Sequence, residues 1–142
     1  MTSAEVLPGP GDGHIPIILL VEDDVLVRFT TAETLRDEGY TVLEAVDAPE
    51  ALALIGTGHP LDLVLSDVRM PGEMDGVALT HAIKAIRPNL PIALISSHLD
   101  PGMTHCGEAF LSKPYEPAHL LLLVEKLVGA KWQTRHSNPT AS

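Results

Sequence analysis

Short apolar runs alternate with helix-period segments along most of this chain, and this alternation constrains its fold more than any other feature. Five mainly apolar runs have the length of a strand; they cover residues 15–21, 41–44, 61–66, 91–95 and 109–112. Continuous apolar runs are typical of strands that are buried on both faces of a sheet. Strands and helices that alternate without a linker or a repeat predict a parallel sheet covered by helices on both faces.

The segments between these runs carry signals for the start of helices. Asp24 and Asp47 are placed to cap helices, and Glu50 has the capping-box position after Asp47. Residues at helical spacing are expected to face the sheet: Val25, Phe29, Ala32 and Leu35, then Ala51, Leu54 and Ile55, then Leu79, Ile83 and Ile86, and finally Leu120, Leu123, Val124 and Leu127. Residues 97–108 leave little room between the fourth and fifth strands, so we predict a shortened or irregular fourth helix there.

Composition limits the kinds of partner and compartment. The chain has 142 residues, which suits one domain, and its net charge of -10 disfavours binding to nucleic acid. Cys106 is the only cysteine, so an intramolecular disulfide is excluded. The apolar runs are too short to cross a membrane, and the amino terminus lacks the pattern of a secretory signal. We therefore expect a soluble cytoplasmic protein without a membrane or nucleic-acid partner.

The two ends of the chain differ in composition from its middle. Residues 1–14 include the sequence Pro8-Gly9-Pro10-Gly11, which disfavours regular structure. Residues 130–142 are mainly polar. We expect a disordered leader over residues 1–14, a folded domain over residues 15–129 and a flexible tail over residues 130–142.

Polar side chains follow four of the five predicted strands. Glu22, Asp23 and Asp24 follow the first strand, Asp67 the third, Ser96 the fourth and Lys113 the fifth. In parallel α/β sheets, ligands bind beyond the carboxyl ends of the strands. The topology therefore predicts that these residues converge at one edge of the sheet.

The chemistry of this set suits a divalent metal ion and a phosphoryl group. Several converging carboxylates repel one another unless a cation lies among them, and oxygen ligands of this kind suit Mg2+. A lysine and a hydroxyl group are suited to phosphoryl oxygens. Asp67 alone could be a metal ligand, a nucleophile or a helix cap, but with these partners we interpret it as a nucleophile that forms an acyl phosphate.

The order and spacing of these residues over positions 15–128 resemble those of the receiver domain of two-component response regulators. The acidic cluster, Arg28, Asp67 with Met70-Pro71-Gly72, Ser96, and Lys113-Pro114 after Phe110 carry the resemblance. Each of these features is common by chance, but their combination is specific. The resemblance implies a doubly wound, CheY-like (flavodoxin-like) fold with five parallel strands in the order 2-1-3-4-5.

The resemblance also implies a role for each residue at the site. Asp67 is similar to the phosphoacceptor, Lys113 to the lysine that pairs with phosphoryl oxygens, and Ser96 and Phe110 to the switch residues. The implied ligands of Mg2+ are Glu22, Asp23, Asp67 and the backbone carbonyl of Arg69, while Asp24 remains a helix cap. The implied phosphodonor is a histidine kinase or a histidine phosphotransfer protein, with the receiver itself catalysing the transfer and its own dephosphorylation.

We therefore expect a stand-alone phosphorylation switch that is not an enzyme acting on external substrates. It would signal by protein contact or act as a phosphate sink. One alternative is an interaction module with the same fold that does not switch. A second alternative is a phosphatase with an aspartyl nucleophile, but Arg69 stands where its second acid would be needed.

Several positions depart from the usual pattern of the family. The short segment of residues 97–108 affects the usual output surface, and Glu73 is an extra residue in the turn after Asp67. Arg69 and His98 occupy positions similar to those that tune phosphoryl lifetime, so we expect an altered hydrolysis rate. His98, His105, Cys106 and Glu108 match no strong metal-ligand spacing, and we interpret them as part of a polar loop.

Overall fold

Strands and helices alternate along the chain in the computed structural model, which describes residues 14–97 and 107–129. The elements are β1 (Ile17–Val21), α2 (Val25–Asp37), β2 (Thr41–Ala45), α3 (Ala48–Gly56), β3 (Leu63–Asp67), α4 (Gly76–Ile86), β4 (Ile92–Ser96), β5 (Ala109–Ser112) and α5 (Pro117–Val128). Each predicted strand is present, with its ends shifted by at most two residues.

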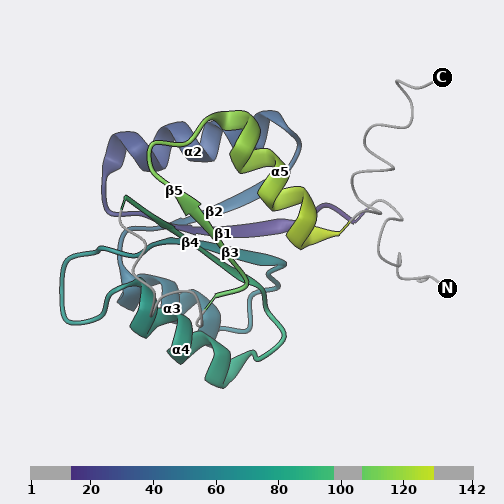
Figure 1. Cartoon of the computed structure of the whole chain (residues 1–142). Helices are drawn as coiled ribbons and strands as arrows, with labels where there is room; N and C mark the ends of the chain where they lie inside the picture. Colours follow the sequence, from purple (N-terminus) through teal and green to yellow (C-terminus); the bar gives the residue numbers. More distant parts are fainter. Residues whose placement is uncertain (1–13, 98–106, 130–142) are drawn as a thin grey trace, which may run out of the picture.

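The five strands form one parallel sheet in the order β2-β1-β3-β4-β5 (Figure 1). This confirms the predicted doubly wound fold and its strand order. The register places Val21 of β1 beside Ala45 of β2 and Ser66 of β3. Asp67 lies beside Ile95 of β4. The carboxyl ends of β1, β3 and β4 therefore lie at the same edge of the sheet.

Helices cover both faces of the sheet, and each face has its own apolar core (Figure 1). The core under α2 and α5 includes Ile18, Leu20, Ala32, Leu35, Leu63, Leu65, Leu120 and Val124. The core under α3 and α4 includes Leu19, Val21, Ala51, Ile55, Val64, Leu79 and Ile83. Neighbouring residues of β1 and β3 enter opposite cores, because successive strand residues point to opposite faces. Continuous apolar runs therefore correspond to central strands buried on both sides.

Side-chain caps begin three of the helices. The carboxylate of Asp24 accepts a hydrogen bond from the N–H of Val27 at 3.0 Å, and Asp47 caps α3 through the N–H of Glu50 at 3.0 Å. The carboxylate of Glu50 accepts a bond from the N–H of Val46, one residue before the cap. Asp75 caps α4 in the same way. Both predicted caps are confirmed.

The inward faces predicted for two helices were wrong at their ends. Val25 and Phe29 of α2 are 65% and 61% exposed, whereas Ala32 and Leu35 further along are fully buried. Ile86, the last residue of α4, is 55% exposed. The buried face of α2 carries Thr31, Ala32 and Leu35, and Arg28 near the start of the helix is also largely covered. Val25 and Phe29 lie to one side of this face, so the predicted stripe was rotated about the helix axis. Ile86 is exposed as the last residue of α4.

Parts of the sequence-based predictions fall outside the described residues. They are residues 1–13 of the leader predicted over residues 1–14, the tail over residues 130–142 and the predicted short helix, which falls mainly on residues 98–106. No helix among the described residues is long and apolar enough to cross a membrane.

Candidate functional site

Asp67 is the last residue of β3, and its side chain lies at the carboxyl edge of the sheet. The residue is 7% exposed. The N–H of Val68 continues the ladder to β4 by donating to the carbonyl of Ile95 at 2.9 Å. After the turn at Gly72, whose φ is +96°, the N–H of Gly76 donates to the carbonyl of Val68 at 2.7 Å. The backbone directly after Asp67 is therefore fixed by two hydrogen bonds.

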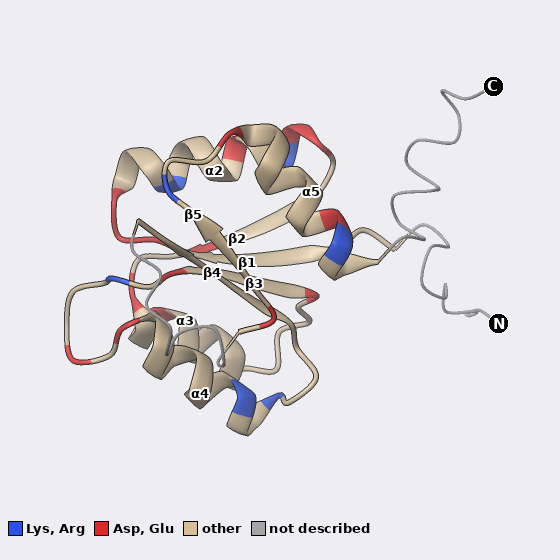
Figure 2. Ribbon diagram, viewed as in Figure 1, with Lys and Arg blue, Asp and Glu red and all other residues tan. Residues whose placement is uncertain are grey.

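Three carboxylates meet at this edge of the sheet. Oxygen atoms of Glu22, Asp23 and Asp67 lie within 4.8 Å of one another. Glu22 and Asp67 are buried, whereas Asp23 is exposed. Acidic segments (red) gather at this edge in Figure 2. The structure thus brings the three predicted side-chain ligands together from the ends of β1 and β3.

Glu22 is held on several sides. Its N–H donates to the carbonyl of Ala45 at 3.0 Å, and its carboxylate Oε2 accepts a bond from the N–H of Asp24 at 3.0 Å. Burial raises the pKa of Glu22, and the charge of Asp67 adds to this, while the bond from Asp24 and the charge of Lys113 oppose it. A raised pKa means that the ionised carboxylate lacks sufficient compensating charge, which is the situation that a bound cation would relieve.

Lys113 supplies the positive charge at this site. Its Nζ lies 3.2 Å from Oδ2 of Asp67 and 3.4 Å from Oε1 of Glu22. Partial burial opposes the charged form of Lys113, but the carboxylates of Asp67 and Glu22 outweigh it and raise the pKa of the lysine. The ammonium group is therefore charged at neutral pH and contacts the predicted phosphoacceptor directly.

Ser96 and Phe110 occupy the two strands beyond β3. Ser96 ends β4, is 2% exposed, and its carbonyl accepts a bond from the N–H of Lys113 at 2.9 Å. Phe110 is half-buried in β5 between Ala109 and Leu111, which pack against the core under α2 and α5. Strand alternation therefore places Phe110 on the opposite face. Their switch roles stay predictions.

The remaining predicted residues lie in turns. Arg69 and Glu73 are exposed between β3 and α4. The use of the Arg69 carbonyl as a metal ligand stays a prediction. His98, His105 and Cys106 lie outside the described residues. Glu108 is described, and its carboxylate bonds to Lys84 and to the N–H of Ile92.

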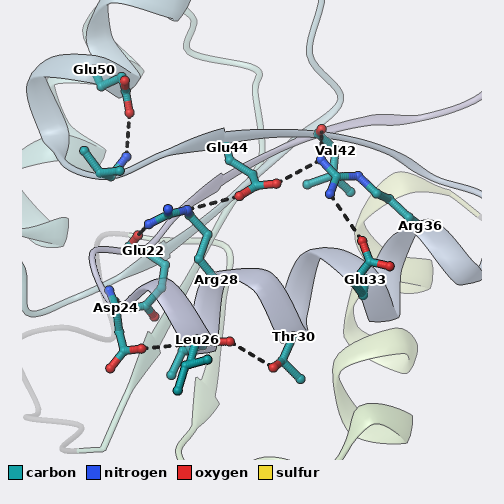
Figure 3. Close-up of polar contacts among 12 residues, drawn as sticks. Glu22, Asp24, Leu26, Arg28, Thr30, Glu33, Arg36, Val42, Glu44 and Glu50 are labelled. Carbon is teal, nitrogen blue, oxygen red and sulfur yellow. Dashed lines mark hydrogen bonds and ion pairs between the residues drawn. The ribbon is translucent and has the colours of Figure 1, made fainter.

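Two side-chain networks beside the site were missed from the sequence. Arg28 of α2 bonds to the carbonyl of Glu22 and to the carboxylate of Glu44 at the end of β2 (Figure 3). The hydroxyl groups of Thr31 and Tyr115 lie 2.6 Å apart and join α2 to the segment after Lys113. Neither network can be predicted without the three-dimensional arrangement of the strands and helices. The sequence offered two signals: Arg28 is among the residues that carry the resemblance, and Glu44 lies near a strand end. Neither signal predicted the bonds.

The residues at this edge fit a hard divalent cation. Three carboxylate groups within ligand distance of one another supply the oxygen atoms that Mg2+ prefers. Asp23 is exposed, so the cluster is accessible to a hydrated ion that keeps some of its waters. Lys113 contacts one side of the cluster and leaves the negative charge only partly neutralised.

Comparisons with known proteins agree with this geometry. Residues 18–125 match the response regulator receiver domain family. The uncharacterized transcriptional regulatory protein YbdJ of Bacillus subtilis is 33% identical over 127 residues, which cover 84% of this chain and 55% of YbdJ. The chain therefore spans about half the length of this relative.

Two solved structures are similar in fold and sequence. The receiver domain of NtrX from Brucella abortus is 35% identical, with a TM-score of 0.72 over 78% of this chain and 97% of that chain. The response regulator protein TrrA from Thermotoga maritima, solved in complex with Mg2+ and BeF, is 26% identical, with a TM-score of 0.73 over 80% and 99% of the two chains. On the family match and these similarities, the chain belongs to the response regulator receiver domain family.

Proposed function

We propose that this protein accepts a phosphoryl group on Asp67 and acts as a phosphorylation switch. The observation that carries the proposal is the contact of the Lys113 ammonium with both Asp67 and Glu22, beside a cluster of three carboxylates. A nucleophilic carboxylate, a fixed cation and a set of metal ligands are the parts that phosphoryl transfer to an aspartate needs.

In the proposed transfer, a carboxylate oxygen of Asp67 attacks the phosphorus of a phosphohistidine. The new O–P bond forms as the N–P bond breaks, and the imidazole leaves with the electron pair of that bond and takes up a proton. The product on this chain is an acyl phosphate. Attack by water on this acyl phosphate returns the carboxylate and releases inorganic phosphate.

Each residue of the site has a part in this proposal. Lys113 pairs with the negative charge that develops on the phosphoryl oxygens. Glu22, Asp23 and Asp67, together with the carbonyl of Arg69, would hold Mg2+, which neutralises phosphoryl charge when it is bound. Ser96 would donate its hydroxyl to the phosphoryl group, and Phe110 would change rotamer with it. The Mg2+ and BeF complex of TrrA supports the metal assignment by similarity.

The proposed partner on the donor side is a histidine kinase or a histidine phosphotransfer protein, as the family implies. On the output side, the chain would signal by protein contact or act as a phosphate sink. The protein would catalyse its own phosphorylation and dephosphorylation without turning over external substrates. We do not propose nucleic acid as a partner, because the net charge of -10 of the chain disfavours binding to phosphate backbones.

The proposal is tested by intact-mass spectrometry after incubation with a small phosphodonor and Mg2+. We expect a mass increase of one phosphoryl group that is absent with a chelator and absent in Asp67→Asn. Asp37→Asn, which changes an exposed acid at the far end of α2, is the matched control and should be phosphorylated normally. A protein that forms no adduct under any condition would instead be a non-switching interaction module. Steady release of phosphate from many monoesters would identify a phosphatase.

A further inference from the structure

We infer that Arg28 is a positioning residue for the metal ligands at the end of β1, although it does not contact their carboxylates in the structure. Its Nη1 donates to the backbone carbonyl of Glu22 at 2.9 Å, and its Nε donates to Oε1 of Glu44 at 3.1 Å (Figure 3). This inference rests on the proposed metal site, since it assigns a function to a residue behind that site.

The contacts of Arg28 fix the turn that carries both acidic ligands. Glu22 and Asp23 follow β1 directly, and α2 begins two residues later at Val25. The carbonyl of Glu22 belongs to the peptide group that joins the two ligands. A bond from Arg28 to this carbonyl therefore limits rotation of that peptide group, on which the direction of both side chains depends.

The side chain of Arg28 is itself well fixed. It is 15% exposed, and its planar guanidinium bonds to the carbonyl of Glu22 directly after β1 and to Glu44 near the end of β2. Because the guanidinium is planar, its two hydrogen bonds cost little side-chain entropy, whereas the ammonium group of a lysine on its flexible stem would lose more for each bond. Glu44 also bonds to Arg36 through its other oxygen, at 3.0 Å (Figure 3). The carboxylate of Glu44, which binds Arg28, is therefore itself fixed by a second arginine.

Charge and geometry predict opposite effects when Arg28 is removed. Arg28 is a cation near a site for a cation, so its charge alone weakens Mg2+ binding, and its loss would tighten binding. If its bond to Glu22 orients the ligands, its loss would weaken binding instead. The direction of the change in Mg2+ affinity thus separates a positioning role from a purely electrostatic one.

Arg36 provides a matched control. It bonds to the same carboxylate of Glu44 and to the carbonyl of Val42, but the structure gives it no bond to Glu22. Arg36→Met therefore removes the same charge and the same ion-pair partner as Arg28→Met. It leaves the peptide group between the two metal ligands unaffected.

The test measures Mg2+ affinity of the full chain by calorimetry at constant ionic strength, with thermal melting of the metal-free protein to confirm folding. We expect Arg28→Met to weaken binding roughly tenfold, as losses of outer contacts to metal ligands commonly do. Arg36→Met should bind Mg2+ within about twofold of the wild-type affinity or more tightly, because only the distant charge changes. Unchanged or tighter binding by Arg28→Met overturns the inference.

A second variant covers the case in which Arg28→Met does not fold. Arg28→Lys keeps the charge but loses the planar fork, and we expect binding about threefold weaker than in the wild type. Wild-type affinity in Arg28→Lys would then contradict the positioning role. Failure of the wild-type protein to bind Mg2+ at millimolar concentration is a separate result, which overturns the proposed metal site itself.

Discussion

Gly76 packs so closely against the main chain of Asp67 that any side chain on Gly76 would collide with the Asp67 carbonyl oxygen. A Cβ there would also lie 2.8 Å from the α-carbon of Val68. Both obstacles are backbone atoms, which cannot rotate away. The first residue of α4 therefore has room only for glycine against the main chain that carries the proposed phosphoacceptor.

Replacement of Gly76 by alanine should destabilise the fold by about 1–3 kcal/mol, because the overpacked backbone must shift. Urea unfolding gives this difference directly. Gly56→Ala is the matched control, since Gly56 is also helical and has open space where a Cβ would lie. That variant should be neutral or stabilised by up to about 1 kcal/mol through helix propensity. Equal effects of the two substitutions would contradict the close packing at Asp67.

The bond between Thr31 and Tyr115 ties α2 to the segment that follows Lys113. The two oxygens are 2.6 Å apart, and Thr31 is 4% exposed. Loss of the hydroxyl in Tyr115→Phe should reduce the free energy of unfolding by about 1 kcal/mol. Thr34→Ala removes a more exposed hydroxyl from the same helix and should stay within about 0.5 kcal/mol. A double-mutant cycle with Thr31→Val should show coupling; additive effects would argue against the bond.

Mg2+ should stabilise the protein against heat, because it binds the folded acidic cluster and relieves its repulsion. At a Mg2+ concentration one hundred times its Kd, mass action adds about 2.7 kcal/mol to the free energy of unfolding. Asp23→Asn should abolish the rise in melting temperature, since it removes one of the three carboxylates. Asp37→Asn should retain the rise. An unchanged melting temperature of the wild-type protein would count against the metal site.

Glu108 should make stability depend on pH. Burial opposes its ionisation, but bonds from Lys84 and from the N–H of Ile92 outweigh burial and lower the pKa of Glu108. A lowered pKa in the folded state means that the carboxylate contributes stability above the usual value of 4.5, which is lost as pH falls through the folded pKa. Glu108→Gln should therefore be less stable than the wild type at neutral pH.

This difference should shrink as the pH falls below the usual glutamate pKa. The glutamine keeps an acceptor for the N–H of Ile92, so the comparison isolates the charge. Urea unfolding of both proteins between neutral and acidic pH measures the effect. A difference that stays constant with pH would show that the charge of Glu108 does not stabilise the fold.

The sequence predicted the parts of the fold that depend on local pattern. Continuous apolar runs correspond to the buried strands, and Asp24 and Asp47 cap their helices as expected. The rule that ligands bind at the carboxyl ends of parallel strands also predicted the convergence of Asp67 and Lys113, which lie 46 positions apart. This worked because all strands of a parallel sheet have their carboxyl ends at the same edge.

Other features depend on relationships that periodicity does not contain. Val25 and Phe29 recur at helical spacing with Ala32, but which side of the helix is covered depends on how the helix is rotated against the sheet. The bond from Arg28 to Glu44 depends on the register of β1 with β2. The contact of Gly76 with Asp67 depends on the path of the turn between β3 and α4. Such features can be predicted only from the three-dimensional arrangement of the helices and strands.

The position of the phosphoryl group in the chain shows whether Asp67 is the phosphoacceptor. After reaction with a small phosphodonor and Mg2+, borohydride reduces an aspartyl phosphate to homoserine, which peptide mass spectrometry can place in the sequence. We predict homoserine at position 67 of the wild-type protein and at no other aspartate. Phosphoryl transfer to a different residue, or undiminished labelling of Asp67→Asn, would contradict the account.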